Sequence, residues 1–307
     1  IAACLKHFAG YGAVNAGREY NDVEISQRTF LEQYVKPFRM ALKAKPAMVM
    51  TAFNAIDRKP ISGNKELLRD LLRDKEGFDG TVISDWGSIG QLEEQGVAAD
   101  MDEAAVQAIE AGVDIDMMSP AYMFRLEELV KNGQIPESFI DESAFRVLMM
   151  KNQLGLFENP FAGLGKSGKL TLYNRTKAYQ MASESCVLLK NEEILPLCQK
   201  QKVIWAGPYV TSKEFLSRWA IFGEHEPVET IEAILQDKKM NAECITGCRM
   251  LSEEECKIWQ VEQDDSDEEM DEQWLERITR EDTVVCVLGE HESQSGEAAS
   301  RAFLTLP

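Results

Sequence analysis

Asp85 and Trp86 are the neighbouring residues of this sequence whose types and position best fit a chemical role. They directly follow Thr81-Val82-Ile83, a short β-branched run that predicts a buried strand, and Gly87 then indicates a turn. In α/β folds, ligands and catalytic side chains gather at the carboxyl ends of strands. A carboxylate can stabilise or attack a cationic anomeric carbon, and an indole can stack on a sugar ring. The pair therefore suits carbohydrate chemistry, with capping of the next helix by Asp85 as the structural alternative.

Three other predicted strands also end in polar or aromatic residues. Lys6 and His7 end the first strand, Phe53 follows the second and Asp116 ends the fourth. A lone histidine is more often a structural residue, but consecutive parallel strands bring such ends to one pocket. Lys6 and His7 would then donate hydrogen bonds to sugar hydroxyls while Asp85 acts on the anomeric carbon.

The elements that must position these residues alternate along residues 1–158. Predicted strands cover 1–8, 47–52, 81–84 and 113–117, and predicted helices cover 26–43, 65–73, 101–111, 123–132 and 137–155. Strands that alternate with helices indicate parallel βα units. About four units are present, whereas a complete (β/α) barrel needs about eight. We therefore expect an α/β fold that begins with part of a TIM-type barrel.

A second α/β region follows a segment rich in Gly and Pro. Residues 159–172 are predicted to be a linker and 173–307 a separate domain. In this domain the sequence predicts helices over 173–185 and 230–236, a strand that begins at 186–190, and strands over 203–206 and 283–288. The chain begins with Ile1, inside a predicted strand, so we expect it to be a fragment.

Composition excludes several classes of function. The net charge of −19 argues against nucleic acid or an anionic membrane as a partner. The seven cysteines are scattered and odd in number, which favours a reducing, cytoplasmic location over a periplasmic or secreted one. Cys244, Cys248 and Cys256 match no common zinc pattern, and the acidic run 262–272 lacks calcium-loop spacing. No metal or cofactor is expected.

A retaining glycosidase needs a second carboxyl group, about 5–5.5 Å from the nucleophile, as acid and then base. The segment 289–301 (GEHESQSGEAASR) follows a predicted strand and offers several glutamates. A surface loop is the structural alternative for this segment.

Eight motifs, spread in order over nearly the whole chain, resemble glycoside hydrolase family 3 and above all its bacterial β-glucosidase branch. They are KHFAGYG at 6–12, GREYN at 17–21, VMTAFN at 49–54, GFDGTVISDWGS at 77–88, AGVDIDM at 111–117, ESCVLLKN at 184–191, LPL at 195–197 and SGEAASR at 295–301. The resemblance implies a (β/α)8 or barrel-like domain followed by an α/β/α sandwich, each incomplete here. It implies a retaining, exo-acting β-glycosidase, in particular a β-D-glucosidase, with an oligosaccharide or an aryl or alkyl β-glycoside as substrate.

The same resemblance implies roles for individual residues. Asp85 corresponds to the nucleophile and Glu297 to the acid/base, with Glu290 and Glu292 as alternative acids. The expected substrate-binding residues are Lys6, His7, Trp86, Phe53 and Trp219. Further barrel strands, which carry an Asp and an Arg for the sugar, precede KHF in the family. The loop over residues 9–20 contains no His, which argues against the N-acetylglucosaminidase branch.

Other readings remain open at this point. A β-xylosidase or related exo-glycosidase is the nearest alternative, because the sequence does not define the aglycone walls. A non-catalytic carbohydrate-binding paralogue or an inactive fragment is the alternative from another class. The sequence does not indicate an oligomeric state.

Overall fold

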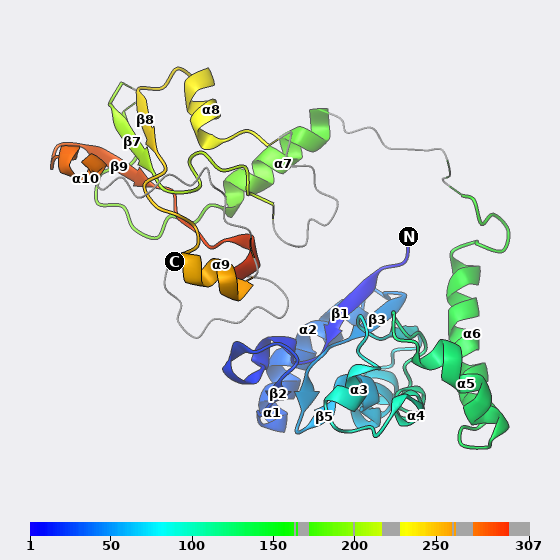
Figure 1. Cartoon of the computed structure of the whole chain (residues 1–307). Helices are drawn as coiled ribbons and strands as arrows, with labels where there is room; N and C mark the ends of the chain where they lie inside the picture. The colour runs from blue at the N-terminus through cyan, green and yellow to red at the C-terminus, as the bar shows by residue number, and fades with distance from the viewer. Residues whose placement is uncertain are drawn as a thin grey trace. The chain divides into compact units, whose positions relative to one another are not determined.

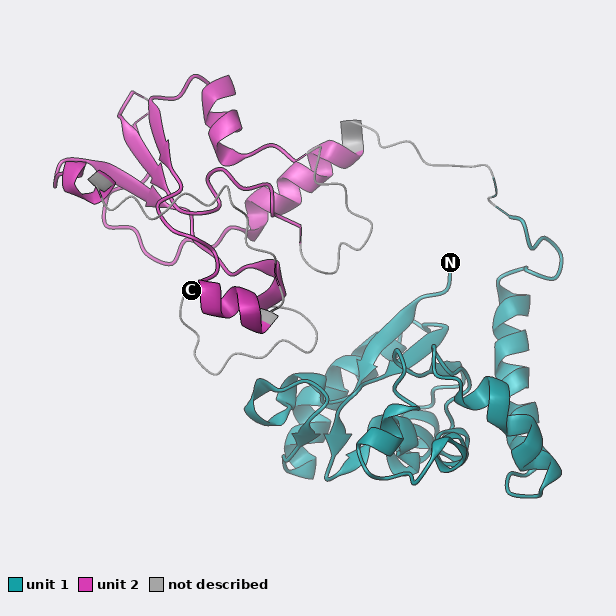
Figure 2. Cartoon of the chain, in the orientation of Figure 1, with its two compact units in different colours: residues 1–165 teal, residues 166–307 magenta. Residues whose placement is uncertain are grey.

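The chain forms two compact units, residues 1–165 and 166–307, coloured separately in Figure 2. The computed structural model describes residues 1–162, 164, 172–198, 200–216, 228–259, 261 and 273–294. The boundary between the units falls inside the predicted linker.

Unit 1 is built on a parallel sheet of β1 (Cys4–Phe8), β3 (Met48–Thr51) and β6 (Thr81–Ile83), in that spatial order (Figure 1). All three strands were predicted from the sequence and are confirmed. Each strand pairs with the next one along the chain, and a parallel bridge from Ile83 to Ile115 continues the series. This neighbour-to-neighbour order is that of a barrel wall. The predicted strand over 113–117 is reduced to that bridge.

A second, smaller sheet in unit 1 escaped the sequence analysis. It pairs β2 (Asp22–Val23) with β4 (Ala55–Ile56), and β4 with β5 (Lys59–Pro60). Strands of two residues carry no periodic signal. They hold the segments that follow β1 and β3 against each other.

The helices of unit 1 lie where the apolar periodicity predicts them. They are α1 (Gln27–Thr29), η3 (Phe30–Val35), α2 (Lys36–Leu42), η5 (Glu66–Lys75), α3 (Gln91–Glu94), α4 (Met101–Ala111), α5 (Ala121–Lys131) and α6 (Glu137–Gln153). Of these, the sequence analysis missed only α3. For α4 the ends are encoded locally. The Asp100 carboxylate accepts a hydrogen bond from the Glu103 N–H, and Gly112 ends the helix with a φ of 96° that favours glycine.

One hydrophobic core fills unit 1. Its fully buried members come from the strands and from the helices that cover them, among them Phe8, Val35, Val49, Leu68, Leu72, Val82, Ile89, Leu92, Ala104 and Ala108. Alanines dominate the buried stripe of α4, which lets that helix approach its neighbours closely. The core therefore gives the strand ends a rigid base.

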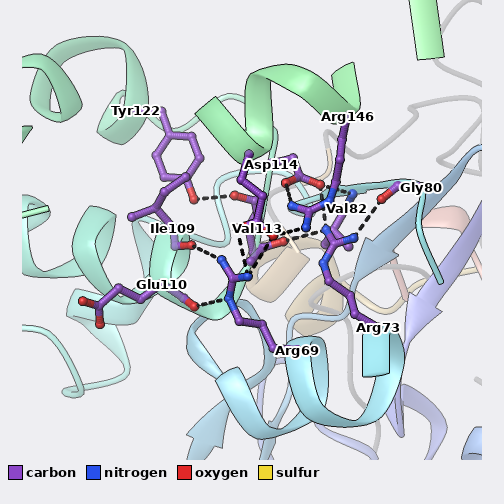
Figure 3. Close-up of polar contacts among 12 residues, drawn as sticks. Arg69, Arg73, Gly80, Val82, Ile109, Glu110, Val113, Asp114, Tyr122 and Arg146 are labelled. Atoms are coloured by element: carbon purple, nitrogen blue, oxygen red, sulfur yellow. Dashed lines mark hydrogen bonds and ion pairs between the residues drawn. The ribbon is translucent and has the colours of Figure 1, made fainter. Parts of the chain in front are cut away.

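Asp114 is the centre of a buried ionic network that ties the helices η5 and α6 to β6 (Figure 3). Its side chain is fully buried and accepts hydrogen bonds from Arg73 at 2.8 Å, Arg146 at 2.9 Å and the Val82 N–H at 2.8 Å. Arg73 also donates to the carbonyl oxygen of Gly80. Burial lowers the pKa of Arg73, and the negative charge of Asp114 opposes that shift.

Because Asp114 balances two buried guanidinium groups, Asp114→Asn is expected to destabilise unit 1 strongly. Removing one partner of a buried ion pair costs about 3–5 kcal/mol, and here Arg73 would stay buried without its carboxylate partner, whereas Arg146 keeps Glu142. Urea unfolding of the chain measures the change. Glu127→Gln is the matched control, because its ion pair with Lys131 is exposed on α5 and should contribute little. Equal stability of the two variants would contradict this role for Asp114.

Unit 2 contains a parallel sheet in the order β8-β7-β9, made of β8 (Ala242–Ile245), β7 (Val203–Ala206) and β9 (Thr283–Cys286). Later strands lie on both sides of β7, so the strand order reverses there, as in doubly wound folds. Its helices are α7 (Leu172–Ser185), α8 (Ile231–Asp237), α9 (Glu253–Trp259) and α10 (Gln273–Arg277). The helix predicted over 173–185, the helix over 230–236 and the strands 203–206 and 283–288 are confirmed. The sequence analysis did not predict β8, α9 or α10.

The prediction that a strand begins at 186–190 is wrong. These residues form no strand, and the Val187 and Leu189 side chains are 77% and 91% exposed. An apolar run becomes a strand only when a neighbour pairs with its backbone, and none does so in the described part of unit 2.

Among the described residues, no helix is both long enough and apolar enough to cross a bilayer.

Candidate active site

The ends of β1 and β6 bring His7 and Asp85 into contact. His7 Nε2 lies 3.3 Å from Asp85 Oδ2, although the two residues are far apart in the sequence. They meet because β1, β3 and β6 are parallel neighbours, so their carboxyl ends share one edge of the sheet. This edge is the candidate active site.

Asp85 combines a rigid position with strong stabilisation of negative charge. The residue is 6% exposed, and its Oδ1 accepts the Trp86 N–H at 2.7 Å. The other carboxylate oxygen, Oδ2, faces His7 Nε2 across 3.3 Å, so a protonated His7 would place a positive charge beside it. The Trp86 N–H at one oxygen and the His7 ring beside the other orient the carboxylate, as a nucleophile or an electrostatic stabiliser requires.

Trp86 and Lys6 lie at the surface of the same edge. Trp86 is 60% exposed, so its indole face is open to a ligand. The Lys6 side chain is also exposed. The pKa of the Cys4 thiol responds to nearby charges as well as to burial. Burial raises this pKa, the charge of Lys6 lowers it and the charge of Asp85 raises it. The charges of Lys6 and Asp85 are therefore both felt at Cys4, the first residue of β1.

Phe53 lies below the surface of this edge. It is 5% exposed, and its ring packs edge-on against Tyr20 with 4.7 Å between the ring centroids. Tyr11 contacts both Phe53 and His7, with centroid distances of 6.1 and 5.1 Å. The structure thus places Phe53 as support for two tyrosines of the loop after β1. The sequence analysis did not single out these tyrosines, although both stand inside its motifs.

Asp116 has a structural role at the start of α5. Its two carboxylate oxygens accept the N–H groups of Ser119 at 3.2 Å and Tyr122 at 3.1 Å, around the start of α5. Burial raises its pKa, and these hydrogen bonds oppose the shift. Helix capping, the alternative considered for Asp85, is therefore what Asp116 does.

The segment 289–301, which contains the three predicted acids, follows β9 in the sequence of unit 2. In a sheet of order β8-β7-β9, the strand order reverses between β7 and β9, and ligands bind at such points in open α/β sheets. Gly207 after β7 lies so close to Val287 after β9 that a Cβ would meet the Val287 carbonyl oxygen at 2.3 Å. The Tyr209 hydroxyl donates to the Glu290 carbonyl oxygen. Of the predicted acids, Glu290 is exposed and Glu292 half-buried.

Two of the predicted site residues, Trp219 and Glu297, lie outside the described residues. In the part of the chain that the structure describes, no group of three or more His, Cys, Asp or Glu side chains is placed to hold a metal ion.

Comparison with known protein families decides what kind of chain this is. Residues 1–150 match the glycosyl hydrolase family 3 N-terminal domain, and residues 186–307 match the C-terminal domain of the same family. The chain belongs to glycosyl hydrolase family 3. The N-terminal domain of this family is a TIM-type barrel and the C-terminal domain an α/β sandwich, so the fold class predicted from the sequence is confirmed.

Several members of family 3 are similar to the chain. The periplasmic β-glucosidase of Salmonella typhimurium is 32% identical over 330 residues, which cover 100% of this chain and 43% of that protein. A putative β-xylosidase of Formosa agariphila is 41% identical over 217 residues, covering 68% of this chain and 29% of that protein. The crystal structure of a Listeria innocua β-glucosidase in complex with glucose matches with a TM-score of 0.85 and 38% identity, covering 100% of this chain and 41% of that one.

The chain thus spans less than half the length of these family 3 relatives. The match to the Listeria enzyme nevertheless extends over both units.

Proposed function

We propose that the protein is a retaining, exo-acting β-glycosidase that removes terminal β-D-glucosyl residues from oligosaccharides or from aryl or alkyl β-glycosides. The observation that carries this proposal is the contact between His7 and Asp85 at the carboxyl edge of a family 3 barrel wall. Relatives named β-glucosidases that match all of the chain support the choice of sugar. A mutant of the Listeria enzyme has been crystallised with laminaribiose, which suggests a β-glucosyl disaccharide as a test substrate.

In the proposed mechanism, an Asp85 carboxylate oxygen attacks the anomeric carbon while the glycosidic C–O bond breaks. The acid, Glu297 in this proposal, gives its proton to the departing oxygen. Water then attacks the anomeric carbon, Glu297 removes a proton from it, and the bond to Asp85 breaks. His7 and the Trp86 N–H stabilise the Asp85 carboxylate before attack and after release.

The proposal is tested by offering the full-length protein that carries this chain matched aryl β-glucosides and β-xylosides, together with laminaribiose. We expect the highest kcat/KM on the glucoside, and NMR during hydrolysis should show β-glucose as the first product. Initial release of α-glucose would contradict retention. Absence of turnover on every substrate would favour a non-catalytic carbohydrate-binding protein.

Preference for the xyloside would support the second candidate, a β-xylosidase. The similarity to the Formosa protein favours that candidate, because its 41% identity exceeds the 32% of the Salmonella β-glucosidase.

We also propose a cytoplasmic location, with a periplasmic or secreted one as the alternative. All seven cysteines are free thiols, which supports a reducing compartment. Fractionation of the host cells tests this part of the proposal.

A further inference from the structure

A ring of buried hydroxyl groups surrounds the backbone of Asp85. The Asp85 N–H donates to Thr51 Oγ1 at 3.3 Å, and that hydroxyl hydrogen-bonds to Ser62 Oγ at 2.9 Å. Ser62 Oγ lies 2.8 Å from Ser88 Oγ. The Ser88 N–H donates to the Asp85 carbonyl oxygen at 3.1 Å, which closes the ring. We call Thr51, Ser62 and Ser88 the hydroxyl ring.

A further hydroxyl holds the carbonyl side of Asp85. Ser84 Oγ donates to the Asp85 carbonyl oxygen at 3.0 Å and accepts the Met117 N–H at 2.8 Å. Both backbone groups of Asp85 are therefore tied to hydroxyls. Asp85 cannot tilt toward or away from a sugar without breaking a buried hydrogen bond.

The hydroxyl ring is placed too deep to touch a substrate. Thr51, Ser62 and Ser88 are 0%, 2% and 3% exposed. Buried hydroxyls are costly unless they are hydrogen-bonded, and an apolar side chain of similar size would suit the surrounding core better for stability alone. The mechanism uses none of these groups directly. Their arrangement points to control of the geometry of Asp85.

The ring also connects elements that are distant in the sequence. Thr51 ends β3, Ser62 lies in the short helical turn Ile61–Gly63, and Ser88 follows β6. Ser62 is 11 residues from Thr51 and 26 from Ser88. Pairing between β3 and β6 ends at Met50 and Ile83, so it does not fix the position of Asp85. The hydrogen bond from the Asp85 N–H to Thr51 fixes that position relative to β3 as well as β6.

We propose that Thr51, Ser62 and Ser88 are positioning residues that set the approach of the Asp85 carboxylate to the anomeric carbon. They act on the rate of covalent bond formation and leave the affinity for the sugar largely unchanged. The inference rests on the proposed glycosidase function with Asp85 as nucleophile.

The test replaces Thr51 with valine, which keeps the shape of the side chain and removes its hydroxyl. In the full-length protein, kcat and the rate constant of inactivation by a 2-fluoro aryl glucoside should fall about 10- to 100-fold, as for a misplaced reacting group. KM and the inactivator's dissociation constant should stay within about twofold. Thr51→Ser, which keeps the hydroxyl, should restore most of the rate.

Thr81→Val is the matched control. Thr81 begins β6 and is 0% exposed, but its hydroxyl has no hydrogen-bond partner among the described residues. Its variant should retain wild-type kinetics. A loss in Thr81→Val equal to that in Thr51→Val would show that removing any buried hydroxyl suffices, and would overturn the inference.

A double-mutant cycle and hydrogen exchange complete the test. Thr51→Val combined with Ser62→Ala should be little worse than Thr51→Val alone, because both break one ring. Amide hydrogen exchange in the peptide 81–88 should become faster in Thr51→Val and stay unchanged in Thr81→Val. Additive losses, or unchanged exchange with wild-type kcat, would overturn the proposal.

Amide hydrogen exchange also distinguishes failure of this inference from failure of the proposed function. If the 2-fluoro reagent labels a residue other than Asp85, or if the wild type is inactive, the proposed function fails. Faster exchange in Thr51→Val would then still support the positioning of Asp85 by the ring, and unchanged exchange would refute it.

Discussion

Replacing Asp85 with alanine is expected to reduce turnover on the order of 10⁴-fold or more, because it removes the carboxylate proposed to form the bond to the anomeric carbon. The side chain is almost fully buried and held by His7 and the Trp86 N–H. Its removal leaves a small space beside those donors. Added azide should therefore restore part of the activity on an activated aryl glucoside and yield α-glucosyl azide, since azide attacks from the side that Asp85 occupied.

Mass spectrometry supplies an independent measurement of the same assignment. A 2-fluoro glucoside should label the wild-type peptide that contains Asp85, and labelling elsewhere would end the assignment. Asp116→Asn is the control, because Asp116 also follows a predicted strand but caps α5. This variant should keep near wild-type kcat and lose at most about 1–2 kcal/mol of stability.

The parts of unit 1 that could be predicted are those with a local signal. The β-branched and apolar runs of β1, β3 and β6 and the capped helix α4 were read directly from the sequence. The parallel order then followed from their alternation, and with it the expectation that strand ends meet. The contact between His7 and Asp85 is consistent with that expectation.

The parts that escaped prediction depend on partners distant in the sequence. Asp114 and Asp116 stand two residues apart in one motif, and only the structure shows that the first neutralises Arg73 and Arg146 while the second caps a helix. The hydroxyl ring is hidden for the same reason, because Thr51 ends β3 whereas Ser88 lies in the turn after β6.

Burial also separates residues that look alike in the sequence. Phe53 and Trp86 are both aromatic residues just after a strand, yet Phe53 is 5% exposed and Trp86 60%. Side chains alternate between the two faces of a sheet only while the strand continues. Both residues lie past the last paired position of their strands, so this alternation does not place them. The residue type therefore could not tell a supporting ring from an exposed one.

Glu297→Ala is expected to distinguish the acid from its two neighbours in the segment after β9. A general acid matters most when the leaving group is a poor one. Turnover of laminaribiose or an alkyl glucoside should therefore fall about 10²- to 10⁴-fold, with a much smaller effect on bond cleavage of a dinitrophenyl glucoside. Azide should accelerate the variant and yield β-glucosyl azide, because it attacks the covalent intermediate from the side opposite Asp85. The opposite anomer from that of Asp85→Ala separates the two roles.

Glu290→Ala and Glu292→Ala are the matched controls for this prediction. Glu290 is exposed and its carbonyl oxygen accepts the Tyr209 hydroxyl, and Glu292 begins the short helical turn Glu292–Gln294. Both stand close to the end of β9, whereas Glu297 is several residues further along the chain. If either control shows the leaving-group dependence and the β-azide product, that glutamate is the acid and Glu297 is not.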